Sequence, residues 1–353
     1  MSYMAALQNQ VLDAGGFPPT PETPPDPWDE QLFTLKDAFK PRKPLQYIIA
    51  GLFPESSLNL AFGAPGTFKS MVLGQAAICV SGGLSFLGRK VLPSPAMWID
   101  LDNGKRRTHE RFEALGRGVG VDESIPFYYL SMPNPWFNAG TSRDIDELTE
   151  MINQRVIKFI VIDNLGLICP DTDENSDQMI LVMSNLRLLA ELTGAAVVLI
   201  HHQRKSIGNN SRTGESLRGH SSIEAALDLP LLVEREEGTP IITFRSTKTR
   251  DVDVPPFGAE FRHDHKPGSD ELKSALFVPL VVEDHSSPAA IERTIQAIVD
   301  EGRKLNQSEL VNKAKSVLTA SEKLIRNTIE KMIREKGIRT IKGPHNSKLH
   351  VPY

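Results

Sequence analysis

Short apolar runs alternate with longer amphipathic stretches through the middle of the chain. The runs are rich in Val, Ile and Leu and are bounded by Gly, Pro or Asp; they cover residues 58–62, 96–101, 159–162 and 196–200. Stretches with helical spacing begin at Lys69 and cover residues 107–115 and 178–193. Continuous apolar runs of this length are typical of parallel strands buried on both faces, with helices as crossover connections. The pattern therefore predicts an α/β fold with a mainly parallel central sheet.

The two ends of the chain depart from this alternation. Six prolines lie between Pro18 and Pro27, acidic residues are mixed among them, and no periodic apolar pattern is present. Such a composition predicts a disordered leader. A stretch with Ser, Pro and His at 284–288 is typical of a linker. The predicted parts are a Pro-rich leader over residues 1–32, an α/β domain over 33–285 and a small domain over 286–353.

The small domain has the pattern of a winged helix. Three helical segments and two short strands are expected, with the helices beginning near Ile291, Ser308 and Ser321 and the strands at 338–341 and 349–351. Residues 291–353 carry 13 Lys and Arg against 7 Asp and Glu, a net charge of +6, although the whole chain has −4. A basic helix-turn-helix commonly enters the major groove of duplex DNA. A protein-docking module and a merely solvated surface remain the alternatives.

Composition narrows the class of protein. Hydrophobic residues make up 40% of the chain and charged residues 24%, which is ordinary for a globular protein. No apolar run approaches the ~18 residues of a membrane helix, and the first residues lack the pattern of a secretory signal. The two cysteines, Cys79 and Cys169, have no metal-like spacing, which argues against zinc and against a disulfide framework. We expect a cytoplasmic protein without a membrane partner.

Residues 63–70 form a candidate phosphate loop between an apolar strand and a helix. In such a loop, backbone N–H groups and a helix N-terminus cradle the phosphates of a nucleotide. Lys69 would reach the β- and γ-phosphates and the Ser70 hydroxyl would bind Mg²⁺, whereas Phe68 stands where glycine is usual and must be accommodated. The alternative is a Gly-rich turn that only caps a helix. We expect ATP to bind to all eight residues of the loop: Gly63, Ala64, Pro65, Gly66, Thr67, Phe68, Lys69 and Ser70.

Two carboxylates stand at the ends of predicted strands. Asp163 ends the run Ile-Val-Ile-Asp, and Asp102 ends the run Trp-Ile-Asp-Leu-Asp. Ligands of open α/β sheets bind outside the carboxyl ends of the strands. Asp163 is therefore expected to bind Mg²⁺, and Asp102 to orient and activate the attacking water. The alternatives are a turn residue for Asp163 and a helix N-cap for Asp102.

Five segments, taken in order, resemble the RecA/DnaB superfamily: GAPGTFKS, MWIDLDNGKRRTHERFEAL, KFIVIDNLGLI, LTGAAVVLIHHQRK and STKTR. The resemblance covers roughly residues 40–262. It is greatest to plasmid RepA-type hexameric helicases and to related AAA-type ATPases of phages and mobile elements. It implies a RecA-like P-loop NTPase fold and a homo-oligomeric ring, with a hexamer as the expected form.

The resemblance also implies roles for individual residues. Asp102 matches the position of a catalytic glutamate, with a side chain shorter by one methylene. His201 and His202 end a strand where such proteins place a polar sensor of the γ-phosphate; a satisfied strand end is the alternative. Lys248 and Arg250 match the position from which relatives project a cation into the neighbouring subunit's ATP, an effect that can be worth ~10³–10⁵ in rate. The alternative is a basic hairpin end that faces solvent.

Residues 203–218 are polar, rich in Gly and Asn, and without periodicity, so we expect a loop. In RecA-like rings the equivalent loop faces the central channel and grips single-stranded nucleic acid. Several cations on one segment can follow a phosphate backbone without reading bases. A surface loop without a ligand is the alternative. The candidate DNA-binding residues are Arg204, Lys205, Arg212 and Arg218.

These features together predict an ATP-hydrolysing, Mg²⁺-dependent motor of the replicative helicase type that acts on single-stranded DNA as a ring. A recombination or repair ATPase that assembles into a filament is one alternative. An ATP-dependent regulator, whose winged helix binds duplex DNA through residues 291–353, is another.

Overall fold

The computed structural model describes residues 28, 32–168, 177–202, 221–247, 254–282, 288–318, 320–344 and 347–353. Contacts divide the chain into two units, residues 1–44 and 45–353. Apart from Trp28 and Leu32, the expected leader lies outside the described residues. The described part of the first unit contains one short helix, α2 (Leu35–Ala38), none of whose residues is buried.

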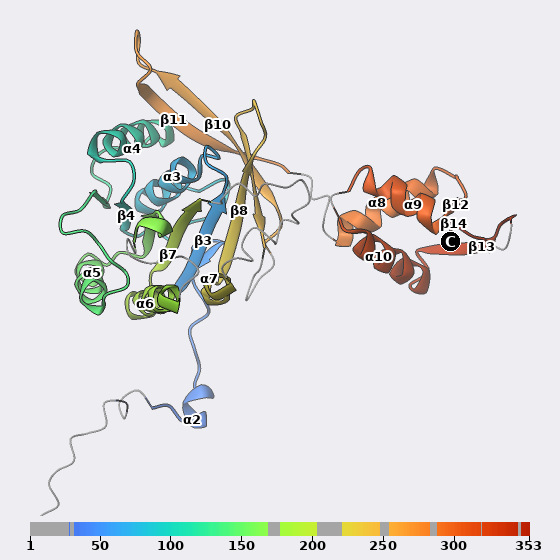
Figure 1. Ribbon diagram of the computed structural model, residues 1–353, viewed down its shortest axis with the longest axis horizontal. Coiled ribbons are helices and arrows are strands. Elements are labelled where there is room, and N and C mark those ends of the chain that lie inside the picture. The colour runs from blue at the N-terminus through green and yellow to red at the C-terminus, as the bar shows by residue number, and fades with distance from the viewer. Residues whose placement is uncertain are drawn as a thin grey trace, which may run out of the picture. The chain divides into compact units, whose positions relative to one another are not determined.

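A nine-stranded sheet forms the centre of the second unit (Figure 1). The strands are β3 (Ser57–Gly63), β4 (Ala96–Asp100), β5 (Phe127–Ser131), β6 (Phe159–Asp163), β7 (Ala196–His202), β8 (Leu229–Arg235), β9 (Ile241–Ser246), β10 (Phe257–His265) and β11 (Leu272–Leu280). Their order is β11-β10-β9-β8-β3-β7-β6-β4-β5. The strands from β8 to β5 are parallel, whereas β9, β10 and β11 add an antiparallel edge. The prediction of a mainly parallel sheet is confirmed.

Alternating side chains build an apolar core on each face of the sheet. In β6, Phe159 and Val161 belong to one cluster, and Ile160 and Ile162 belong to the other. Helices α3 (Lys69–Gly82) and α4 (Lys105–Val119) contribute to the first cluster. Helices α5 (Ser142–Gln154), α6 (Asp177–Thr193) and α7 (Ser221–Ala226) lie with the second (Figure 1). The sheet is thus the middle of three layers, as strands that are apolar on both faces require.

Several smaller elements complete this part of the chain. Strands β1 (Tyr47–Ile49) and β2 (Phe53–Pro54) pair with each other before β3, and a short 3-10 helix, η2 (Leu165–Leu167), follows β6. The apolar pattern does not predict β5, β10 or β11. β5 is half exposed at one sheet edge, and the second half of β10 is polar and exposed, so neither has a continuous apolar run. No helix within the described ranges is both long and apolar enough to cross a bilayer.

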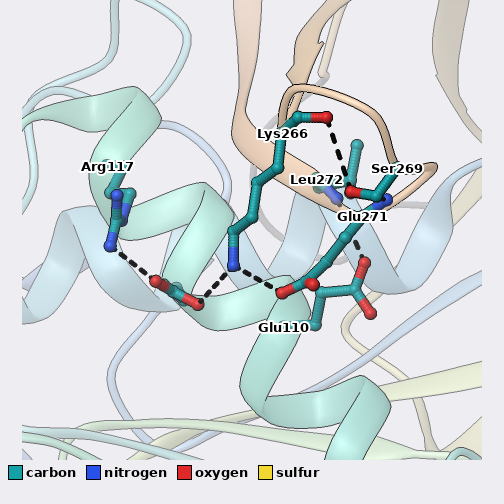
Figure 2. Close-up of polar contacts among 7 residues, drawn as sticks. Glu110, Arg117, Lys266, Ser269, Glu271 and Leu272 are labelled. Atoms are coloured by element: carbon teal, nitrogen blue, oxygen red, sulfur yellow. Dashed lines mark hydrogen bonds and ion pairs between the residues drawn. The ribbon is translucent and has the colours of Figure 1, made fainter.

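Helix α4 packs against the β10–β11 hairpin through polar contacts (Figure 2). The Lys266 ammonium lies 2.5 Å from the Glu271 carboxylate and 3.8 Å from that of Glu113 on α4. Glu110 Oε1, also on α4, accepts the Leu272 N–H at 3.1 Å. The helix that follows β4 is thereby connected to the antiparallel edge of the sheet.

The C-terminal residues form three helices and a three-stranded sheet. The elements are α8 (Pro288–Asp300), β12 (Leu305–Asn306), α9 (Gln307–Lys315), α10 (Glu322–Arg334), β13 (Ile338–Lys342) and β14 (Lys348–Pro352). Their apolar side chains form a cluster of their own. α9 begins at Gln307, one residue before the expected Ser308, because Asn306 is its N-cap and forms a capping box with Glu309. Ser321 caps α10 as predicted.

Candidate functional site

Strand register brings the predicted residues to one edge of the sheet. Asp100 of β4 stands opposite Asp163 of β6, and Gly63 of β3 stands opposite His202 of β7. Strand β8, parallel to β3, ends at the same edge with Arg235. Because parallel strands present their carboxyl ends together, the candidate phosphate loop, two acids and a histidine meet at this edge.

The loop between β3 and α3 folds around the side chain of Lys69. Its Nζ donates hydrogen bonds to the carbonyl oxygens of Gly63 at 3.0 Å and Ala64 at 2.8 Å, and to Thr67 Oγ1 at 3.1 Å. Burial lowers the pKa of Lys69 to about 8, and the Asp163 carboxylate opposes this effect. An ammonium held by the loop itself is in position to meet phosphate oxygens.

The two ends of the loop are packed in the fold, whereas its tip is exposed. Gly63 has a φ of 152°, and a Cβ there would lie 2.2 Å from the Val233 carbonyl oxygen, so only glycine fits between the loop and β8. Pro65 and Gly66 are exposed, and Ser70 is half-buried at the start of α3. The loop is thus open to solvent at its tip and anchored at both ends.

Phe68 adopts the left-handed backbone conformation, with φ 61° and ψ 19°. Its ring is half-buried and packs on Phe261 and Phe277, with centroid distances of 4.7 and 6.2 Å. The Arg235 guanidinium lies over the ring, 4.2 Å from its centroid. The side chain that replaces the usual glycine is therefore accommodated on the antiparallel edge of the sheet.

Asp163 is a fully buried carboxylate. Neither oxygen accepts a hydrogen bond of ordinary geometry within the described residues, although the Ser70 hydroxyl lies close enough to act on its pKa. Burial raises its pKa to about 6. The nearby Ser70 hydroxyl lowers it, the charges of Asp100 and Asp102 raise it, and the Arg111 guanidinium, a residue that the sequence patterns do not indicate, lowers it. A buried carboxylate with unused oxygens is costly unless another group completes its coordination. Mg²⁺ prefers such oxygens, so Asp163 with Ser70 fits a magnesium ion.

Asp100 is a buried acid that the sequence prediction missed. Its carboxylate accepts six hydrogen bonds, from Asp102 N (3.2 Å), Asn103 N (2.9 Å), Asn103 Nδ2 (3.1 Å), Gly104 N (3.2 Å), Thr108 Oγ1 (2.6 Å) and Ser131 Oγ (2.8 Å). Burial alone would raise the pKa of Asp100, but these hydrogen bonds hold it below its ordinary value. Asp100 therefore shapes the turn between β4 and α4. The available signal was the Asp-Leu-Asp order, in which one acid ends the strand and the other follows it.

Asp102 and His202 lie beside this pair of acids. Asp102 is exposed just beyond β4, and its charge raises the pKa of both Asp163 and His202. Burial and the charge of Lys69 lower the pKa of His202 more strongly, so its imidazole is neutral at physiological pH. His202 Nδ1 is buried without a partner within the described residues, whereas the neighbouring His201 is buried in the sheet.

Six predicted site residues lie outside the described residues: Arg204, Lys205, Arg212, Arg218, Lys248 and Arg250. The segments that flank them are described. β7 ends at His202, directly before residue 203, at the edge that holds the other candidate residues. β9 runs back from that edge, and Thr247, whose N–H donates to the Pro230 carbonyl at 3.2 Å, lies at the opposite edge.

The site as a whole fits a nucleotide with Mg²⁺, because a lysine-filled loop stands beside a buried carboxylate with unused oxygens. Residues 22–207, more than half of the chain, match the family model of the AAA domain. The matched segment contains the phosphate loop, Asp100, Asp102, Asp163 and His202. It also begins within the expected leader. The protein is therefore a member of the AAA domain family and a P-loop ATPase.

Proposed function

We propose that this ATPase is a nucleic-acid-dependent motor of the RepA-like helicase type, which acts on single-stranded DNA as a homo-oligomeric ring. The observation that carries the catalytic part is the meeting of Lys69 with the unsatisfied carboxylate of Asp163 at one sheet edge. A hexamer is the form that the sequence resemblance implies.

Five residues at this edge have roles in hydrolysis, in which water attacks the γ-phosphorus and ADP leaves. Lys69 neutralises charge on the β- and γ-phosphate oxygens. Ser70 and Asp163 hold Mg²⁺, which supplies further neutralisation of the phosphates when bound. Asp102, exposed beside the acids, orients the water and accepts its proton, and His202 contacts the γ-phosphate.

The course of β9 supports an active site that is shared between subunits. Lys248 and Arg250 follow Thr247, which lies at the sheet edge away from the phosphate loop. From Pro230 at that edge, β8 runs to Arg235 at the edge with the phosphate loop. This separation is roughly 17 Å at ~3.3 Å per residue. A cation that starts from there serves the ATP of a neighbouring copy more readily than its own.

The link to DNA follows from chain connectivity. The basic segment 203–218 begins directly after His202, the residue proposed to contact the γ-phosphate. Its four cations, Arg204, Lys205, Arg212 and Arg218, would neutralise DNA phosphates. Loss of the γ-phosphate would then be communicated to the DNA-binding segment through a single strand end.

The C-terminal residues favour a second candidate, an ATP-dependent regulator. Three helices followed by a two-stranded hairpin, with a third short strand, resemble a winged helix, and residues 291–353 carry a net charge of +6. Such a module commonly binds duplex DNA. In this reading hydrolysis times the binding, and no strand separation occurs.

The deciding experiment measures steady-state ATP hydrolysis with and without single-stranded DNA for the wild type, Lys69→Ala and Arg250→Ala. We expect DNA to stimulate the wild type and both variants to lose at least ~10³-fold in rate, because each removes a cation from the phosphates. Mixing the two variants should restore part of the activity, since some interfaces then contain an intact Lys69 and an intact Arg250. A rate that is indifferent to DNA would exclude the motor and favour the regulator, and filaments on DNA would favour a recombinase.

A further inference from the structure

Phe68 has a backbone conformation that is unfavourable for phenylalanine. Its φ of 61° lies in the left-handed region, which glycine adopts freely and residues with a Cβ rarely adopt. The residue directly precedes Lys69, so its conformation decides where the ammonium and the following N–H groups point. Some interaction outside the loop must therefore hold Phe68 in place.

The Phe68 ring is anchored on strands that lie far along the chain. It packs on Phe261 of β10 at 4.7 Å and on Phe277 of β11 at 6.2 Å, and these two rings pack on each other at 4.8 Å. Tilted and edge-on aromatic pairs at these distances are attractive beyond their buried area. The antiparallel edge of the sheet thus provides a fixed seat for the ring.

Arg235 holds the same loop from β8. Its guanidinium lies 4.2 Å from the centre of the Phe68 ring, a cation–π distance. Its Nη1 is 3.4 Å from the Gly66 carbonyl oxygen, and its Nε donates to the Thr239 carbonyl oxygen at 3.0 Å. One exposed arginine therefore contacts the loop at two residues and the β8–β9 turn at a third.

We propose that Phe68 and Arg235 form a clasp that replaces the usual glycine and sets the phosphate-binding conformation of the loop. Both are positioning residues, because they act through the backbone that orients Lys69. The clasp rests on the proposal that this loop binds ATP. It also makes the affinity for ATP dependent on the β10–β11 hairpin, which carries the seat of the ring.

Two substitutions of Phe68, to alanine and to glycine, distinguish the clasp from a side chain that only fills space. Phe68→Ala removes the anchor but keeps the backbone strain, so the affinity for a Mg²⁺-bound non-hydrolysable ATP analogue should fall about tenfold, as strain of this kind predicts. Phe68→Gly removes both the anchor and the strain, so its affinity should fall by less than about threefold. A residue that only fills space would give the opposite order, because glycine leaves the larger gap.

Arg235 provides an independent test that does not disturb the core, because its side chain is exposed. Arg235→Ala should weaken binding of the analogue about three- to tenfold in the wild type, and less than about twofold in the Phe68→Gly background, where nothing remains to clasp. Arg235→Lys should retain part of the affinity, since a lysine can also lie over the ring. The matched control is Arg262→Ala, which removes an exposed arginine of β10 paired with Glu260 at 2.7 Å and should leave binding unchanged.

Binding is measured by fluorescence titration of the full chain, and thermal unfolding verifies that each variant is folded. The clasp is wrong if Phe68→Gly binds more weakly than Phe68→Ala, or if Arg235→Ala has the same effect in both backgrounds. Lys69→Ala distinguishes a failure of the clasp from a failure of the ATP site. Loss of binding in Lys69→Ala, with Phe68→Ala and Arg235→Ala unaffected, refutes the clasp alone, whereas wild-type binding by Lys69→Ala refutes the ATP site and the clasp together.

Discussion

Asp100 and Asp163 stand opposite each other in adjacent strands, and they represent two ways of burying a carboxylate. Asp100 accepts hydrogen bonds from backbone and side chains, and its pKa lies below the ordinary value. Asp163 accepts no hydrogen bond of ordinary geometry among the described residues and has only the Ser70 hydroxyl nearby, and burial raises its pKa to about 6. The first charge stabilises the fold, whereas the second costs free energy of folding that a bound cation would offset.

Asp163→Asn should therefore stabilise the protein while removing its ATPase activity. The pKa of Asp163 is about 6 in the folded state, against about 4 in the unfolded chain. Raising the pH from 4 to 6 thus deprotonates the unfolded chain first and lowers the stability of the wild type. At pH 8 the free energy of unfolding of Asp163→Asn should exceed that of the wild type by on the order of 1–3 kcal/mol. Urea unfolding at pH 8 and pH 4, without nucleotide or metal, measures this difference, which should vanish at pH 4.

Asp100→Asn is the matched control, because it alters the opposing acid and should act in the other direction. The pKa of Asp100 is held low by hydrogen bonds that its charge strengthens, so the substitution should destabilise the protein at pH 8. If Asp163→Asn were no more stable than the wild type at pH 8, the Asp163 carboxylate would already be satisfied within the protein and would not need a bound cation.

The sequence identifies the candidate site residues, but it does not assign each of them its role. Residues 63–70 and Asp163 were identifiable because motif and strand end coincide. Within Asp-Leu-Asp, however, the local pattern cannot tell the role of Asp100 from that of Asp102. The two roles differ because Asp100 accepts hydrogen bonds from residues later in the chain, such as Thr108. The contacts of the Phe68 ring could not be predicted either, because its partner Phe261 lies almost a full domain length later in the sequence.

At the scale of elements, helix α4 lies directly on strand β11. A Cβ at Gly118 would lie 1.9 Å from the Ala275 carbonyl oxygen, a backbone atom that cannot move aside. Gly118→Ala should therefore separate the helix from the hairpin and lower the free energy of unfolding by about 1–3 kcal/mol. Because the hairpin also seats Phe68, the affinity for ATP should fall in parallel. Urea unfolding and nucleotide titration measure the two effects.

Gly116, two residues earlier in the same helix, is the matched control. A Cβ there would meet only Val121 Cγ2, at an ordinary distance of 3.6 Å. Gly116→Ala should thus gain helix propensity and stabilise the protein by up to ~1 kcal/mol. Equal effects of the two substitutions would show that close contact with β11 is not what limits position 118.

The sequence predicted the strands that are buried along their whole length and missed the strands that are only partly buried. β6 and β7 are buried along nearly their whole length and read as continuous apolar runs. β10 changes from buried to exposed after Phe261, so its pattern fits neither a strand nor a helix. α10, by contrast, was evident because Ile325, Ile329 and Met332 share one buried face.

At the scale of the whole molecule, the chain combines an acidic ATPase part with a basic C-terminal part that has its own apolar cluster. Within α10, Arg326 pairs with Glu322 at 2.8 Å and Lys331 with Glu292 at 2.8 Å, so these charges are partly neutralised. Lys323 and Arg334 are exposed and have no ion pair among the described residues. They lie about three turns apart and thus share a helix face.

This distribution predicts which residues bind duplex DNA if the C-terminal part is a winged helix. In the full chain, Lys323→Ala and Arg334→Ala should each weaken duplex binding about three- to tenfold and lower the slope of log affinity against log salt by about 1. Arg326→Ala, the control, should have less effect, because the Arg326 guanidinium is already paired with Glu322 and contributes less to phosphate binding. Fluorescence anisotropy at several salt concentrations measures all three variants. Equal slopes for the wild type and every variant would exclude α10 from the DNA interface. The remaining interpretation of its basic face would be a docking surface for an acidic protein, which would recruit the ATPase instead of duplex DNA.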